Sequence, residues 1–164
     1  MKRAALSVLL LTVFLLSGCG GLTFAPDFAP LRAFSLSVEA TVNGKPFAGE
    51  LVCASYEEIS LTLTAPEELR GLTVSAADSG YRIELDGMTD DLPRDRLPPN
   101  APLRLLFDAV RAAVFTNHGA FAGDRETKTY TAALTVNGQP VTVVFSEDGS
   151  LNHLTADRLT AVFQ

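Results

Sequence analysis

The side chains of this sequence that could carry chemistry are two cysteines, two histidines and one run of acids. Cys19 and Cys53 could pair in a disulfide, ligate a metal, act as nucleophiles, or serve unrelated purposes. His118 and His153 have no cysteine and no second histidine at a metal-ligand spacing. Because a zinc site needs three or four ligands in a defined array, we interpret both histidines as surface or loop residues and predict no metal.

The acidic run comprises Asp86, Asp90, Asp91 and Asp95. Several carboxylates close together could hold a calcium ion, which prefers oxygen ligands. Their spacing does not match an EF-hand loop, and runs of like charge are usually solvated. We therefore interpret this segment as an acidic surface loop.

The sequence contains no recognisable catalytic arrangement. Cys53 has no histidine or basic residue close to it in the sequence that would activate its thiol, so we interpret it as a small buried hydrophobic residue. No serine occupies a nucleophile elbow, and no glycine-rich phosphate loop is present. We predict that the protein is not an enzyme and uses no cofactor.

The residues that precede Cys19 have the pattern of an export signal. Lys2 and Arg3 supply the positive start, residues 4–16 form an apolar run, and two small residues follow. The run is shorter than the roughly 20 residues that a membrane-spanning helix needs. We predict that residues 1–18 are a signal peptide that is removed from the mature chain.

The segment Leu-Ser-Gly-Cys at 16–19 resembles the lipobox of bacterial lipoproteins. In that family the cysteine receives a diacylglyceryl group, and two acyl chains anchor a protein stably where one holds it only marginally. The resemblance implies that Cys19 is lipidated and that the protein lies on the extracytoplasmic face of a bacterial membrane. The alternative is an ordinary secretory signal with a chance cysteine near its cleavage site. Once Cys19 is acylated, Cys53 has no disulfide partner.

The mature chain is acidic. Removing the signal takes Lys2 and Arg3 from the 13 basic residues and leaves all 19 acidic ones, a formal net charge of −8. This charge argues against nucleic acid as a partner and against electrostatic attraction to an anionic lipid surface. The acyl anchor must therefore hold the protein at the membrane.

The mature chain divides into a short tether and one domain. Residues 19–32 form the lipidated N-terminus and the tether, because paired glycines and two Phe-Ala-Pro triplets disfavour regular structure. Residues 33–164 are enough for one domain with a substantial core.

The domain begins with a strong β-hairpin signal. Apolar and polar residues alternate from residue 34 to residue 42, and Asn43-Gly44 follows. Counting outward from that turn pairs Phe34 with Cys53 and Leu36 with Leu51, so turn chemistry and hydrophobic pattern select the same register. Asn137-Gly138 predicts a second hairpin near the C-terminus in the same way.

The remaining elements are strands and one helix. We predict strands at 59–64, 72–76, 81–86, 151–154 and 159–163, and a loop at 87–100. Asn100 is predicted to cap a helix at 101–113, which would place Arg104, Asp108 and Arg111 outside its apolar stripe. Eight to ten antiparallel strands with one helix make an α+β fold.

This order of elements resembles the small extracytoplasmic lipoproteins with a LolA/LolB-like domain, including germination-associated relatives in clostridia. The matching stretches are Pro66–Val74, Gly87, Leu97-Pro98 and Asp148-Gly149. The resemblance implies a curved, incompletely closed antiparallel sheet, a half-barrel, with a helix over the concave face that shelters acyl chains. This chain departs from LolA by carrying its own anchor, and Leu69 is its nearest match to the exposed hydrophobic loop residue of LolB.

The remaining functional candidate is the apolar face that the strands and the helix turn inward. Its residues are Leu36, Val38, Leu51, Ile59, Leu61, Leu63, Val74, Ile83, Leu85, Leu103, Leu106, Phe107 and Val110. One hypothesis is that this face binds an acyl chain, of a lipid or a lipoprotein, or another apolar ligand. The alternative is a filled core in a non-enzymatic scaffold that binds an envelope protein. Apolar periodicity is the same in both cases, and most inward apolar faces are simply packed.

Overall fold

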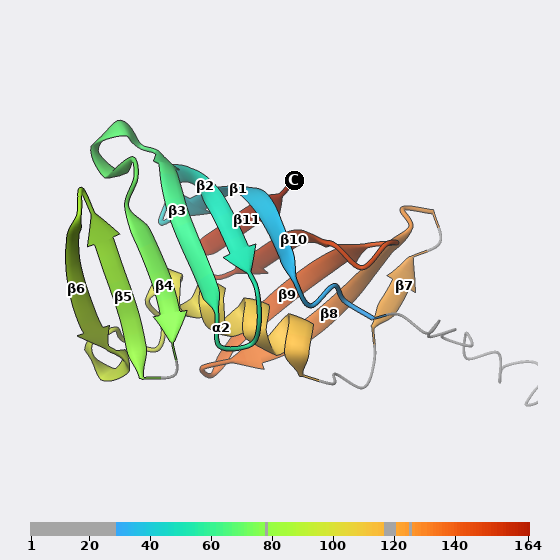
Figure 1. Ribbon diagram of the computed structural model, residues 1–164. Helices are drawn as coiled ribbons and strands as arrows, with labels where there is room; N and C mark the ends of the chain where they lie inside the picture. Colours follow the sequence, from blue (N-terminus) through green and yellow to red (C-terminus); the bar gives the residue numbers. More distant parts are fainter. Residues whose placement is uncertain (1–28, 78, 117–120, 125) are drawn as a thin grey trace, which may run out of the picture.

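Among the described residues, the fold is one large antiparallel sheet with a single α-helix packed on it, an α+β architecture (Figure 1). A computed structural model describes residues 29–77, 79–116, 121–124 and 126–164. The predicted signal peptide, the lipidation site Cys19, most of the tether and His118 lie outside the described residues.

Over the described ranges the sheet contains eleven strands, in the order β6-β5-β4-β3-β2-β1-β11-β10-β9-β8-β7. Their bounds are β1 Phe34–Val42, β2 Lys45–Cys53, β3 Ile59–Ala65, β4 Thr73–Ala77, β5 Gly80–Leu85, β6 Met88–Pro93, β7 Ala122–Asp124, β8 Thr129–Val136, β9 Gln139–Ser146, β10 Leu151–Ala156 and β11 Leu159–Phe163. The last strand returns to pair with the first, with Ala40 opposite Ala161. The sheet stays open, because β6 and β7 are its two edges.

Both predicted hairpins form in the predicted register. Phe34 pairs with Cys53 and Leu36 with Leu51 in β1–β2, and Ala132 pairs with Val143 in β8–β9. In each turn the Asn and the Gly both have positive φ, near +52° and +78°. Two successive residues of positive φ make the turn type whose twist matches that of paired strands, and Asn-Gly adopts it at low cost.

The predicted loop at 87–100 was wrong in part. Its first half is the edge strand β6, and Arg94–Arg96 form a short 3₁₀ turn, η2. Asp86 and Gly87 both have positive φ, so they form a third hairpin turn of the same kind. β6 contains two acids and ends in proline, which is the composition that edge strands use to avoid pairing with other chains.

The helix α2 spans Pro102–Phe115, and two details of its prediction were wrong. Asn100 does not cap it: the N-cap is Ala101 without a side-chain hydrogen bond, and Pro102 opens the first turn. Proline suits that position because its φ is already helical and it has no N–H to satisfy. Asp108 and Arg111 lie inside rather than on the solvent face, 8% and 4% exposed.

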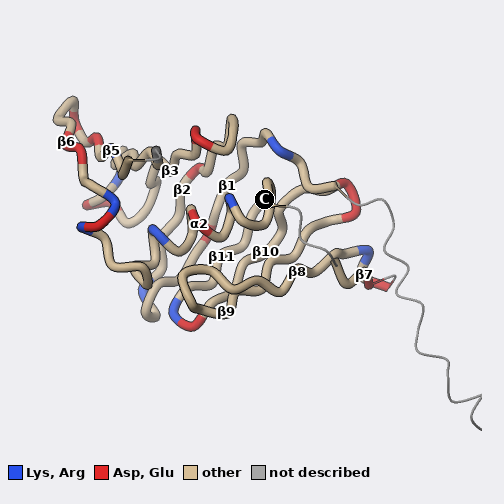
Figure 2. Tube along the Cα trace, turned by 90° about the horizontal axis from the view of Figure 1, so that it is seen from below, with Lys and Arg blue, Asp and Glu red and all other residues tan. Residues whose placement is uncertain are grey.

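The helix joins the two halves of the curved sheet (Figure 1). It packs on β8 and β9 on one side, while its Phe107 ring stacks on Tyr81 of β5 at 6.1 Å between centroids. The main core lies between the helix and the strands and includes fully buried Phe107, Phe145, Leu51 and Leu154. Figure 2 shows the charged residues gathered in loops and along β6, with uncharged stretches along β8–β11.

Candidate functional site

The inner face of the sheet brings most of the predicted apolar residues together under α2. Eight of them are buried to 4% exposure or less and belong to one core cluster: Val38, Leu51, Ile59, Leu61, Val74, Leu106, Phe107 and Val110. A side chain that lined an empty cavity wide enough for an acyl chain would present surface to a water-sized probe. These side chains present almost none, so no cavity of that width lies against them.

The other five predicted residues, Leu36, Leu63, Ile83, Leu85 and Leu103, are only partly buried. Leu63 lies near the end of β3, and Ile83 and Leu85 lie near the end of β5. Leu72, just before β4, lies beside Leu63, because its carbonyl accepts a hydrogen bond from the Leu63 N–H. All four share the face of buried Leu61 and Val74, since side chains alternate along strands. We call Leu63, Leu72, Ile83 and Leu85 the open corner.

Two exposed hydrophobic residues lie at the same end of the strands as the open corner. Met88 pairs with Leu85 across β5 and β6 and is 69% exposed. Leu69 lies in the short 3₁₀ turn η1, Glu67–Leu69, between β3 and β4, and is 40% exposed. The open corner and these two residues form the apolar surface at that end of the half-barrel.

A partly buried ionic cluster holds the middle of α2. The carboxylate of Asp108 accepts hydrogen bonds from the Arg94 guanidinium at 2.5 Å and from the Asn137 side-chain amide at 2.8 Å. The Arg104 Nε lies 3.6 Å from the same carboxylate, and its Nη1 donates to the Arg94 and Leu97 carbonyls. We call Asp108, Arg94, Arg104 and Asn137 the Asp108 cluster. It ties α2 to the η2 segment and to the β8–β9 turn.

A second polar contact holds the C-terminal half of α2 against the other half of the sheet. Arg111 donates from Nε to the Tyr56 carbonyl at 2.9 Å and from Nη2 to the Ala76 carbonyl at 3.2 Å. Its guanidinium also lies over the Tyr56 ring, 5.5 Å from the centroid, and that ring meets Phe115 edge to face. The helix is therefore fixed to the sheet by polar contacts as well as by apolar packing.

Tyr81 lies between the two polar contacts. Its hydroxyl is buried and has no hydrogen-bond partner among the described residues. Burial and the nearby negative charge of Asp108 both raise the pKa of Tyr81, so the phenol stays protonated at neutral pH.

Cys53 is buried on the inner face, as predicted from the register. Its Sγ lies 3.6 Å from the carbonyl oxygens of Arg32 and Ser55. Burial raises the pKa of its thiol to about 11, against a smaller opposing effect of Arg111. Because the thiolate is the reactive form, this cysteine is a poor nucleophile.

We expect Cys53 to report on unfolding. At pH 8 a thiol reagent should label the native Cys19→Ser form, in which Cys53 is the remaining cysteine, far more slowly than the same form in denaturant. Between pH 9 and 11 the unfolded thiol loses its proton while the folded thiol keeps it, so the unfolded state is favoured and stability falls as pH rises. Denaturant titrations at pH 8 and pH 10 measure this fall, and Cys53→Ala should make it smaller. Equal labelling rates with and without denaturant would contradict the assignment.

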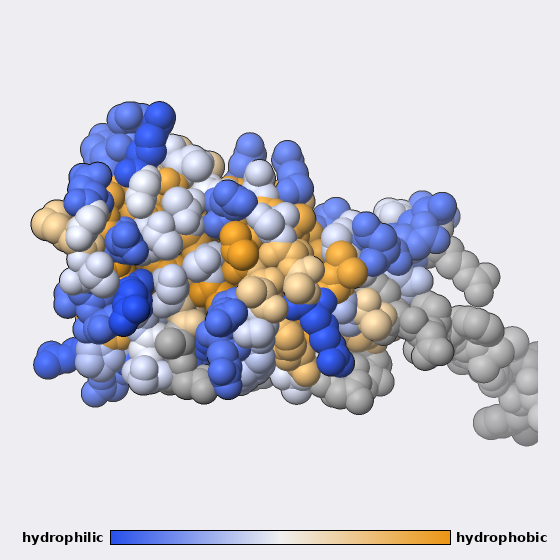
Figure 3. Space-filling model, in the orientation of Figure 1, coloured by the Kyte–Doolittle hydropathy of each residue, from blue (hydrophilic) through white to orange (hydrophobic). Residues whose placement is uncertain are grey.

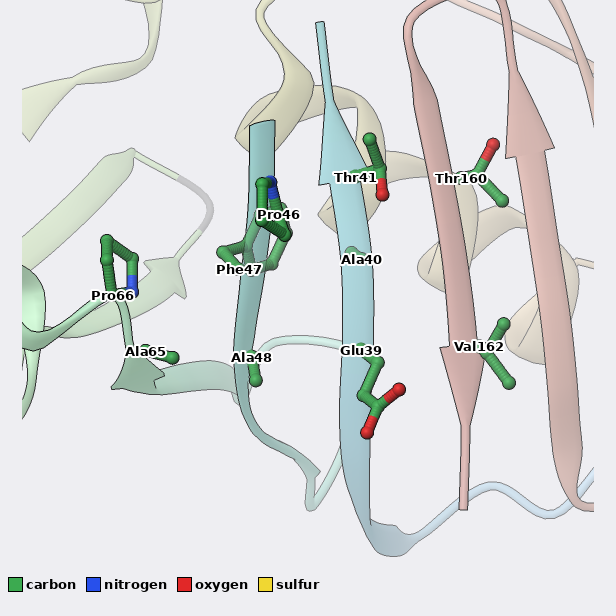
Figure 4. Close-up of a pocket in the computed structure, with 10 residues that line it drawn as sticks. All are labelled: Glu39, Ala40, Thr41, Pro46, Phe47, Ala48, Ala65, Pro66, Thr160 and Val162. Atoms are coloured by element: carbon green, nitrogen blue, oxygen red, sulfur yellow. The ribbon is translucent and has the colours of Figure 1, made fainter. Parts of the chain in front are cut away.

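The face of the sheet away from α2 carries an apolar hollow of about 440 Å³ (Figure 4). Small residues at its floor, Ala48 and Ala65, leave room between Pro46, Pro66 and Val162 at its sides. A register shift between Ala48 and Gly49 of β2 contributes to the irregular surface. The hollow is on the opposite side of the sheet from the predicted ligand-facing residues.

A second hollow, of about 490 Å³, lies over β4–β6 and is more polar. Arg82 and Asp91 form an exposed ion pair at its edge, 2.9 Å between Nε and Oδ1, and this contact lowers the pKa of Asp91. Of the four acids of the predicted acidic loop, Asp91 is therefore paired. Within the described ranges, no group of three or more His, Cys, Asp or Glu side chains could hold a metal ion.

No protein-family model and no curated protein matches the sequence. The fold is similar to that of a LolA superfamily protein from Nitrosomonas europaea. That likeness has 10% identity and a TM-score of 0.40, and it covers 84% of this chain and 85% of the other. A second solved structure, PNGF-II, is similar at 7% identity and a TM-score of 0.36; 82% of this chain matches 28% of that one.

The site contains polar residues that were not predicted from the sequence. The aliphatic residues were predicted, and the register placed Cys53 correctly, but the Asp108 cluster was missed. Its members come from the η2 segment, α2 and the β8–β9 turn, up to 43 positions apart between Arg94 and Asn137. The one local signal was an acid and two arginines close together on an otherwise apolar helix.

Among the described helices, α2 included, none has the length and hydrophobicity to span a bilayer.

Proposed function

We propose that this chain is a lipoprotein on the extracytoplasmic face of a bacterial membrane that binds an acyl chain or another apolar group without catalysing a reaction. In this proposal residues 1–18 are the signal, Cys19 carries the lipid, 19–32 are the lipidated N-terminus and tether, and 33–164 bind the ligand. The ligand contacts the open corner, which lies beyond the sealed part of the inner face.

The observation that carries this proposal is the change in burial along the inner face. Near the middle of α2, Leu61 and Val74 are sealed. Leu63 and Leu72 each lie two residues away from them along the chain, and Ile83 lies one strand across from Val74. All three keep part of their surface in solvent. Exposed aliphatic side chains that share one concave face form the kind of surface that apolar ligands occupy.

A second function is favoured by the sealed part of the interior. If the open corner binds no small ligand, the sealed core and the unpaired edge strand β7 fit a scaffold that binds an envelope protein. Pull-down from membranes with the anchored chain, compared with the Cys19→Ser form, tests for such a partner.

The ligand hypothesis predicts a site-specific loss of binding. In the soluble Cys19→Ser form, Leu85→Glu should weaken binding of a fluorescent fatty acid by about tenfold or more, because a carboxylate pressed against an acyl chain loses its hydration. Val162→Glu places the same charge in the outer hollow and should leave the affinity unchanged. Fluorescence titration measures both, and circular dichroism checks that each variant is folded.

Native mass spectrometry of protein made in cells provides an independent readout. A bound species of lipid mass on the parent form, absent from Leu85→Glu, supports the proposal. Uniformly ligand-free protein that also fails to bind the probe would leave the scaffold as the better explanation. Loss of binding in Val162→Glu but not in Leu85→Glu would move the ligand to the outer hollow and contradict the proposed site.

A further inference from the structure

The outer face of the sheet has an apolar patch at the end opposite the open corner. Val52 of β2 points outward, because its neighbours Leu51 and Cys53 are buried, and it is 37% exposed. Ala54 follows it, and Ala33 and Leu31 precede β1, which pairs with this part of β2. Leu31 is 43% exposed. We call these four residues the outer patch, and Figure 3 shows hydrophobic residues gathered over β2 and the start of β1 on this face.

The outer patch adjoins the point where the tether joins the domain. The Leu31 N–H donates to the Gly149 carbonyl at 2.9 Å, which fixes the first described residues to the β9–β10 turn. Between Cys19 and Ala29 the sequence provides nine residues. Nine extended residues span roughly 30 Å at most, so an acyl anchor on Cys19 keeps this end of the domain close to the bilayer.

The charges around the outer patch specify which lipid surface it fits. Glu50 lies two residues before Val52 on the same outward face, where it accepts a hydrogen bond from Ser35 at 2.6 Å. Glu57 and Glu58 are exposed in the following loop, and Arg32 is the one basic residue within the stretch 31–35. An apolar patch with an acidic surround is repelled by anionic headgroups and tolerated by neutral ones.

From these observations we propose that the outer patch lies against the surface of a neutral phospholipid bilayer. The domain is thereby oriented with the open corner and Leu69 directed away from the membrane. This inference rests on the lipid anchoring in the proposed function and adds the orientation of the anchored domain. The apolar area of the outer patch is too small to hold a protein on a membrane by itself. It is sufficient to orient this domain, because the anchor already confines the domain to the bilayer surface.

The chain itself allows a clean spectroscopic test. In the acylated protein Cys19 is blocked and Cys53 is buried with a raised thiol pKa, so Val52→Cys introduces a single reactive thiol. Val52→Cys, Leu69→Cys and Met88→Cys are each labelled with bimane, and the full mature chain is placed in phosphatidylcholine vesicles. The two control positions are also exposed, 40% and 69%, and lie at the other end of the domain. We expect a blue shift and quenching by brominated lipids at position 52 alone.

Each outcome of this experiment decides the proposal. Quenching at position 69 or 88 rather than 52 would reverse the orientation and overturn it. A bimane spectrum at position 52 that equals the spectrum of the same variant in the soluble Cys19→Ser form would also overturn the proposal. Replacing a third of the lipid with phosphatidylglycerol should reduce the quenching at position 52. If the mass of the Cys19 peptide shows no acylation, the anchor and the inference both fail. Fatty-acid binding at the open corner is measured without a membrane and can hold or fail independently.

Discussion

Replacing Asp108 with alanine should lower the free energy of unfolding by about 3–5 kcal/mol, because it leaves partly buried cations without their partner. The substitution leaves the Arg104 guanidinium, 15% exposed, without a carboxylate, whereas the exposed Asn137 amide keeps its hydrogen bond to the Pro99 carbonyl. Arg94 is about one-third exposed and can turn to water, so we expect the lower end of that range. Urea titration of the soluble Cys19→Ser form measures the loss.

The control for this prediction is the exposed ion pair of β5 and β6. Asp91 and Arg82 are more than 60% exposed, and water and salt screen pairs of that kind, so they contribute little to stability. Asp91→Ala should therefore change stability little. A loss below 1 kcal/mol for Asp108→Ala would show that its cluster is solvated and contributes little to holding α2.

The two predicted hairpins succeeded because two independent signals agreed at each. Asn-Gly fixes the turn geometry, and the alternating pattern fixes which face is buried. A slip of one residue between β1 and β2 would have moved Leu36 and Val38 to the solvent face. The register could therefore be counted from the sequence residue by residue, and the structure has that register.

The edge strand β6 was missed although its turn was visible. Asp86-Gly87 is a hairpin signal of the same class as Asn43-Gly44, but Met88–Pro93 lacks the apolar alternation of a half-buried strand. At a sheet edge that alternation is not required, since only Leu92 turns toward the core. Backbone pairing decides such strands, and a pattern of side chains carries little information about it.

The polar contacts of α2 could not be predicted for a different reason. Helical periodicity separates apolar from polar positions, and it assigns Asp108 and Arg111 to the solvent face. They are buried because the sheet curls around the helix and supplies partners for them: Asn137 from one side and the Ala76 carbonyl from the other. Burial of a charged residue follows from where its partners lie, which is a property of the tertiary fold.

Whether the interior beneath α2 is filled is tested most directly by Phe107→Ala. Phe107 is fully buried and stacks on Tyr81, so its truncation should cost about 3–5 kcal/mol and leave an apolar cavity. Phe115→Ala makes the same change on the same helix at a partly exposed position and should cost less. Urea titration measures both losses.

The same pair of variants separates a filled core from a ligand cavity. A dry cavity lined by aliphatic and aromatic side chains binds benzene-sized molecules. If the parent interior is filled, benzene should raise the melting temperature of Phe107→Ala and leave the parent and Phe115→Ala unchanged. Stabilisation of the parent by benzene would instead reveal room beneath α2, and the ligand site would then extend from the open corner to Leu61 and Val74. The sealed burial of those two residues argues that it does not.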